Sequence, residues 1–133
     1  MIAYVIAFVA TAIVFLGIDV IWLKYIAKDF YATHMGELMR DDPKLGAAAI
    51  FYLFYVLGII YLVIAPHMES GNWKAVLISG AVLGALAYGT YDMTNYAVLK
   101  GYPLKVAIID IAWGTALTAT ASLAGFFATK LFG

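Results

Sequence analysis

One stretch of the chain combines acidic, amide, hydroxyl and aromatic side chains within an otherwise apolar segment. It covers residues 87–96 and reads Ala-Tyr-Gly-Thr-Tyr-Asp-Met-Thr-Asn-Tyr. A carboxylate such as Asp92 costs roughly 2.5 to 3.5 kcal/mol near the centre of a bilayer on insertion scales, so it normally faces a partner, a cavity or a ligand. A carboxyl group in such a place can hold a proton, pair with a cation or act as a general acid or base.

Two further aspartates are expected at the depth of Asp92. Asp19 lies near the end of the first apolar segment, and Asp110 lies near the start of the fourth. In a bundle of alternating helices these ends share one leaflet, which puts each carboxylate roughly 7 to 12 Å below the interface. Because burial and like charge favour the neutral form, at least one is expected to be protonated near neutral pH unless a cation occupies the site.

Aromatic and amide side chains are expected in the same layer. Tyr52 and Tyr55 fall at this depth, and a phenol is a natural donor to a buried carboxylate. An aspartate followed three residues later by a tryptophan occurs twice, at Asp19 and at Asp110, on segments expected to run in opposite directions. The predicted ligand-binding or proton-binding pocket consists of Asp19, Asp92, Asp110, Asn95, Tyr91, Trp22, Trp113, Tyr52 and Tyr55.

Four functions are compatible with this cluster. We favour a ligand-binding or accessory protein that accepts an amphiphilic or cationic small molecule, since aromatic faces and carboxylates suit a cation. The alternatives are a proton-coupled carrier acting as an oligomer, and a lipid- or isoprenoid-modifying enzyme that uses two aspartates as acid and base. In the fourth case the aspartates only tie helices together, at about 0.6 kcal/mol each. The expected partners are membrane lipids and a second copy or another membrane protein.

The composition is typical of an integral membrane protein. Of 133 residues, 65% are hydrophobic and 12% are charged, whereas about a quarter of a soluble domain is charged. A net charge of zero without a basic run argues against nucleic-acid binding. The absence of cysteine excludes thiolate metal sites, iron–sulfur clusters and thioether-attached haem. No metal site or other cofactor is predicted, although carboxylates suit a hard cation.

Four apolar stretches are each long enough to cross roughly 30 Å of hydrocarbon. They predict a single all-α domain with membrane helices over residues 2–27, 44–65, 73–99 and 104–130. A short amphipathic helix at the membrane surface is expected within residues 29–42, either as a connector or as a lid over the cluster. The first segment has no Lys or Arg ahead of it, so we expect a retained helix and not a cleaved signal.

Helix-capping residues, prolines and a glycine predict where the helices begin and end. Asp42 followed by Pro43 is typical of a helix start, and Asn72 is a suitable cap for the third membrane helix. Pro66 is expected to end the second helix. Gly101 suits a tight reversal between the third and fourth helices, which are therefore expected to be antiparallel neighbours.

Small residues predict two packing faces. Gly80 and Gly84 lie four residues apart, and further steps of four lead to Tyr88 and Asp92. Glycines at this spacing let another helix backbone come close. The fourth helix has its own small-residue face, made of Gly114, Thr118, Ala121, Ser122 and Gly125.

The distribution of basic residues predicts the orientation in the membrane. One side is expected to hold Lys24, Lys28, Arg40, Lys44, Lys100 and Lys105. The other side is expected to hold Lys74 and Lys130. Because basic residues favour the cytoplasm, the loops at residues 28–43 and 100–103 are predicted to be cytoplasmic and both termini outside.

Three motifs carry a resemblance to a known family. They are the Asp-x-x-Trp motif that begins at Asp19, the Tyr-Asp-Met-Thr-Asn-Tyr-Ala run at residues 91–97 and the Asp-Ile-Ala-Trp-Gly run at residues 110–114. Over essentially its full length the chain resembles a bacterial family of small four-helix membrane proteins described as a domain of unknown function. The resemblance implies a multi-pass protein of the inner (cytoplasmic) membrane. It implies no activity, substrate or site residue.

Overall fold

The computed structural model describes residues 1–36 and 45–132. All regular structure in these ranges is helical, in the order α1 (Ile2–Ile21), α2 (Lys28–Met35), α3 (Leu45–Ile59), α4 (Trp73–Val98) and α5 (Leu104–Phe132). A π-helical turn at Trp22–Ile26 extends α1. A second π-helical turn at Ile60–Ile64 and a 3-10 turn at Ala65–His67 extend α3.

Four helical stretches in the described ranges are long and apolar enough to cross a membrane. They are Ile2–Ile26, Gly46–His67, Trp73–Val98 and Leu104–Phe132. The prediction of an all-α bundle with four membrane helices is thereby confirmed.

Local signals at the helix ends act as expected, with one difference. The side-chain oxygen of Asn72 accepts a hydrogen bond from the backbone N–H of Ala75 at 3.2 Å, which caps α4. Gly101 has a φ of 77° in the reversal before α5, a conformation that glycine adopts without steric cost. Pro66 does not end the second membrane helix, because its ring fits the start of a 3-10 turn that continues to His67. The predicted helix start at residues 42–43 lies outside the described residues.

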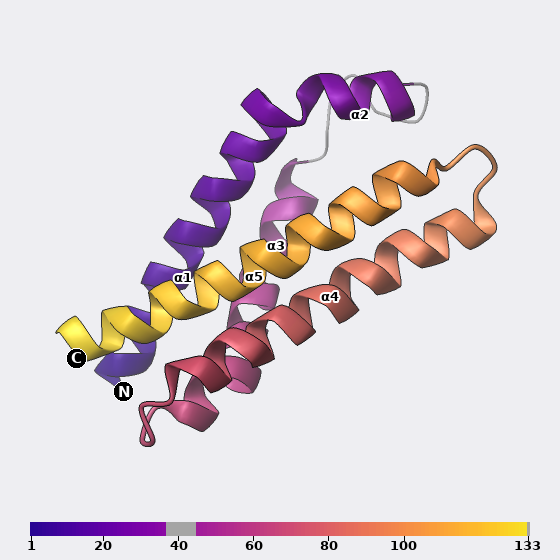
Figure 1. Cartoon of the computed structure of the whole chain (residues 1–133). Coiled ribbons are helices and arrows are strands. Elements are labelled where there is room, and N and C mark those ends of the chain that lie inside the picture. Colours follow the sequence, from indigo (N-terminus) through magenta and orange to yellow (C-terminus); the bar gives the residue numbers. More distant parts are fainter. Residues whose placement is uncertain (37–44, 133) are drawn as a thin grey trace.

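The surface helix expected after the first membrane helix is α2, which lies across one end of the bundle (Figure 1). Its polar residues Lys28 and Asp29 are exposed. Phe30 and Met35 instead pack on a small buried cluster formed by Tyr102, Val106 and Ala107. An amphipathic sequence therefore holds α2 against the reversal and the start of α5.

The long helices α4 and α5 lie side by side, and α1 packs on α5, with both chain termini at the end opposite α2 (Figure 1). A Cβ atom at Gly80 would lie 2.9 Å from Oγ of Ser122. One turn further along, Gly84 faces the backbone carbonyl of Gly114. The two predicted small-residue faces therefore meet each other, which lets the backbones approach closely.

The apolar core occupies the half of the bundle nearest the termini. Phe15 and Phe126 are fully buried there, and the π-helical turn Ile60–Ile64 packs against α1, α4 and α5. The preceding helix, α3, makes its main contacts with α1 and leaves a space between itself, α4 and α5. The two halves of the bundle are thus built differently, one filled by side chains and the other hollow.

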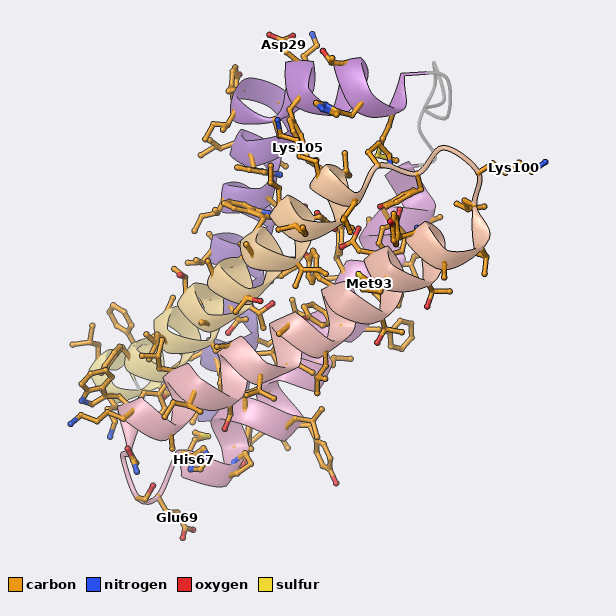
Figure 2. All side chains as sticks on the ribbon, turned by 45° about the vertical axis from the view of Figure 1, so that its right-hand side comes forward. Asp29, His67, Glu69, Met93, Lys100 and Lys105 are labelled. Carbon is orange, nitrogen blue, oxygen red and sulfur yellow. The ribbon has the colours of Figure 1, made fainter. Side chains whose placement is uncertain are left out.

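Charged side chains gather at the two ends of the bundle (Figure 2). Asp29, Lys100 and Lys105 lie at the end that carries α2, and His67 and Glu69 lie at the other end. The band between them exposes large apolar side chains on all four membrane helices. Such a band is the surface that a bilayer covers.

Candidate functional site

A cavity of about 520 Å³ occupies the hollow half of the bundle. All five helices and the reversal contribute to it. Its lining residues are Asp19, Trp22, Leu23, Met35, Ala48, Phe51, Tyr52, Tyr55, Ala87, Tyr88, Tyr91, Tyr102, Val106, Asp110 and Trp113. Aromatic rings make much of the wall, two carboxyl groups give it negative character, and its volume suits a small organic molecule.

Two tryptophans from antiparallel helices form one wall of the cavity. The rings of Trp22 and Trp113 stack with centroids 4.2 Å apart and planes inclined by 11°. Trp22 is the first residue of the π-helical turn that extends α1, and such turns are frequent at functional sites because they redirect side chains. The duplicated aspartate–tryptophan spacing therefore brings the two indoles together.

Side chains from two other helices meet the carboxyl of Asp19. The indole N–H of Trp113 donates to Oδ1 of Asp19 at 3.2 Å. Tyr52 on α3 also interacts with the Asp19 carboxyl. The two contacts position a side chain that is only 6% exposed.

Asp92 lies behind the wall of the cavity, where its side chain is fully buried. The hydroxyl group of Tyr102 donates to Oδ1 of Asp92 at 2.8 Å. Burial and then this hydrogen bond raise the pKa of Tyr102, which keeps the phenol neutral and able to donate. On its other side, the carboxyl of Asp92 lies within hydrogen-bonding reach of Asp110, which lines the cavity.

Tyr91 and Asn95 lie at the edge of the cluster. Tyr91 lines the cavity and is also 58% exposed. Asn95 is not part of the lining, because its side chain is engaged with the hydroxyl groups of Tyr91 and Tyr102. The amide therefore orients two phenols at the margin of the cavity and does not face its interior.

Tyr55 and Tyr88 close the cavity towards the apolar core. The hydroxyl groups of Tyr55 and Thr118 are hydrogen-bonded at 2.9 Å. Tyr88 packs on Gly114, where any side chain would collide with its ring. The two tyrosine rings meet edge to face with centroids 6.5 Å apart, a favourable aromatic geometry.

Seven of the nine side chains expected in the pocket line the cavity. The exceptions are Asp92 and Asn95, since helix packing buries the first behind the wall and hydrogen bonding holds the second at the edge. The sequence reasoning missed Tyr88, Tyr102 and Met35 as lining residues. Tyr88 lies between Gly84 and Asp92 in the series of residues spaced four apart on α4. This spacing could have predicted that Tyr88 lies in the site.

Among the described residues, no group of three or more histidines, aspartates or glutamates is arranged to hold a metal ion. His34 is oriented by a bond between its Nδ1 and the carbonyl oxygen of Phe30 at 2.9 Å, on α2.

The fold and the site define a multi-pass integral membrane protein with an aromatic and acidic cavity inside its spans. The chain belongs to the family described as "Predicted membrane protein (DUF2177)", whose model matches residues 4–127. This match confirms the resemblance carried by the three motifs. No curated protein and no solved structure matches the chain. The family description states a membrane location and no activity, so the function is inferred from the cavity itself.

Proposed function

We propose that this protein binds an amphiphilic small molecule with a cationic head group, as a ligand-binding or accessory protein of the membrane. The observation that carries the proposal is the cavity of about 520 Å³ within the membrane spans, with the carboxyl groups of Asp19 and Asp110 beside the stacked indoles.

The lining favours a positive charge. Asp19 and Asp110 interact electrostatically with each other across the cavity wall, so a cation between them relieves their mutual repulsion. Among the described lining residues there is no lysine, arginine or histidine to compete for the carboxylates. The faces of tryptophan and tyrosine attract cations further, at about 0.5 to 2 kcal/mol each.

The mouth of the cavity favours a molecule that arrives through the bilayer. Two lining residues are also strongly exposed, Phe51 on α3 at 64% and Tyr91 on α4 at 58%. Both belong to the membrane-spanning stretches, so the surface around them faces hydrocarbon. An apolar tail leaving the cavity there would lie among lipid chains while the head group stays at the carboxylates.

A single chain is better suited to binding than to transport. The half of the bundle nearest the termini is filled by the apolar core, so the cavity has no continuation to that side. The carrier hypothesis therefore needs either an oligomer or a second conformation. The enzyme hypothesis needs a substrate whose reacting bond lies between Asp19 and Asp110. The carrier and the enzyme would both first have to bind a ligand in this cavity.

We further propose that the protein resides in the inner membrane with both termini outside. Lys24, Lys28, Lys100 and Lys105 lie at the end that carries α2, and Lys74 and Lys130 lie at the other end. This excess of basic residues supports a cytoplasmic location for α2 and a cavity in the cytoplasmic half of the bundle.

The test is native mass spectrometry combined with solvent extraction of the purified protein. We expect a positively ionising amphiphile that copurifies with the wild type and falls at least tenfold in Asp19→Asn and Asp110→Asn. Ala48→Phe, which reduces the cavity without changing its charge, should also remove it.

Asp29→Asn is the matched control, because Asp29 is an exposed carboxylate on α2 outside the lining. It should retain the molecule. Circular dichroism confirms that each variant is folded. An equal amount of bound molecule in all variants, or none in the wild type, would contradict the proposal.

A further inference from the structure

One oxygen of Asp92 has no hydrogen-bond donor. Tyr102 satisfies Oδ1, but Oδ2 is buried and unpartnered among the described residues. The Asp92 side chain is 0% exposed, so bulk water does not reach it. A buried acceptor left without a donor costs about 1 to 3 kcal/mol, and more when it carries a charge.

The group within reach of Asp92 is another carboxyl. Asp110 on α5 lies close enough to Asp92 for the two carboxyls to interact. The other titratable groups that face the two carboxyls, from α1, α3, α4 and the reversal, are Asp19, Tyr52, Tyr88, Tyr91 and Tyr102. Two ionised carboxylates can only accept hydrogen bonds, whereas a carboxylic acid next to a carboxylate donates one.

We propose that Asp92 and Asp110 form a site for a single proton in the wall of the cavity, and that a cation entering the cavity displaces this proton. A proton held between the two carboxyls gives Oδ2 of Asp92 its missing partner and removes one of two like charges from a medium of low dielectric. Asp19 is not part of this site, because Trp113 donates to its Oδ1 and, among the described residues, neither of its oxygens is a buried atom without a partner.

The exchange conserves charge at the site. Before binding, the pair carries one negative charge and one proton. When a cation pairs with Asp110, the O–H bond breaks, the proton leaves through the cavity to the buffer, and both carboxyls are ionised. One cation enters and one proton leaves, so the net charge is unchanged. The displacement of the proton by a cation rests on the proposed function, whereas the shared proton site does not.

Infrared spectroscopy of the ligand-free protein in lipid nanodiscs tests the proton site. At neutral pH the wild type should show the C=O stretch of a neutral carboxylic acid, and the band should vanish as the pH is raised. Asp92→Asn and Asp110→Asn should both lack the band, since the amide then donates to the remaining carboxylate. Asp19→Asn and Asp29→Asn should keep it. A wild type without the band, or a band that survives in both pair variants, overturns the proton site.

Calorimetry with tetraphenylphosphonium tests the exchange. This lipophilic cation carries no titratable proton, so any proton released on binding comes from the protein. Titrations in two buffers of different ionisation enthalpy, corrected with empty nanodiscs, should show about one proton released per cation bound to the wild type. Binding should persist in Asp92→Asn with proton release near zero.

The outcomes separate the two proposals. Binding without proton release in the wild type overturns the exchange and leaves the proposed function standing. No binding in the wild type overturns both the proposed function and the exchange, and the infrared band then decides the proton site by itself.

Discussion

Trp22 and Trp113 stack face to face across two antiparallel helices, with ring centroids 4.2 Å apart. Each tryptophan follows an aspartate by three residues, and one of the two aspartates, Asp19, accepts the indole N–H of the tryptophan on the opposite helix. The same short motif used on both helices therefore builds an aromatic wall and positions a carboxylate beside it.

The indole pair should have a spectroscopic signature. Close indoles couple their strong far-ultraviolet transitions, so we expect a circular dichroism couplet in that band that is lost in both Trp22→Phe and Trp113→Phe. Trp73→Phe is the control, because Trp73 is 44% exposed at the other end of the bundle. A couplet that persists in the first two variants would show that the rings are not stacked.

Trp113→Phe should weaken the fold, because it removes the indole N–H that donates to Oδ1 of Asp19 and also part of the aromatic pair with Trp22. An aromatic pair is worth about 0.5 to 1.5 kcal/mol. The loss of a buried hydrogen bond adds about 1 to 3 kcal/mol. Unfolding free energies in mixed micelles measure the total, and a loss no larger than that of the aromatic pair would speak against a role for the N–H.

Removing the hydroxyl group of Tyr102 should destabilise the protein. In Tyr102→Phe the buried Oδ1 of Asp92 loses its donor, at an expected cost of about 1 to 3 kcal/mol in the free energy of unfolding. Tyr96→Phe is the matched control, since Tyr96 is a 43% exposed tyrosine near the end of α4. A Tyr102→Phe variant as stable as the control would mean that water or another group replaces the phenol.

Glycine-to-alanine changes on α4 should have opposite signs at two positions. At Gly84 a Cβ would collide with the carbonyl of Gly114 and the side chain of Thr118, so Gly84→Ala should cost about 1 to 3 kcal/mol. At Gly89 nothing lies within 4 Å, and Gly89→Ala should gain up to about 1 kcal/mol from helix propensity. Thermal unfolding measures both, and equal effects would contradict the tight contact of α4 with α5.

Single cysteines can establish the orientation, because the chain has none of its own. We expect Ser70→Cys, in the exposed turn before α4, to react with a membrane-impermeant maleimide added to intact cells. Lys100→Cys, at the α2 end of the bundle (Figure 2), should react only after the membrane is opened. The reverse pattern would place both termini in the cytoplasm.

The helices and their ends could be predicted from the sequence because their signals are local. Apolar length predicts a span, and the Asn72 side chain caps α4 by bonding to a backbone N–H three residues away. The Gly80 and Gly84 spacing predicted a packing face because residues four apart share one side of a helix. None of these features depends on which helix is the neighbour.

That Asp19 and Asp110 share one layer of the bundle could be predicted as well, since it follows from counting residues along helices of known rise. Asp19 and Asp110 fall in one layer, and the structure brings both to one cavity. Their aromatic neighbours Trp22 and Trp113 followed from the same counting. Counting residues along one helix gives the position of a side chain along the bundle axis. It does not give the direction in which that side chain points.

Only the tertiary structure decided the direction of each side chain within that layer. The rotation of α4 against α5 turns Asp92 into the wall towards Tyr102 and Asp110, and leaves Tyr88 and Tyr91 facing the cavity. The close approach of the glycine faces sets that rotation, and the separation of α3 from α4 and α5 sets the volume of the cavity. The sequence by itself therefore determined the membrane class, the four spans and the acidic layer. Helix packing alone decided which carboxyls line the cavity and which one is buried behind its wall.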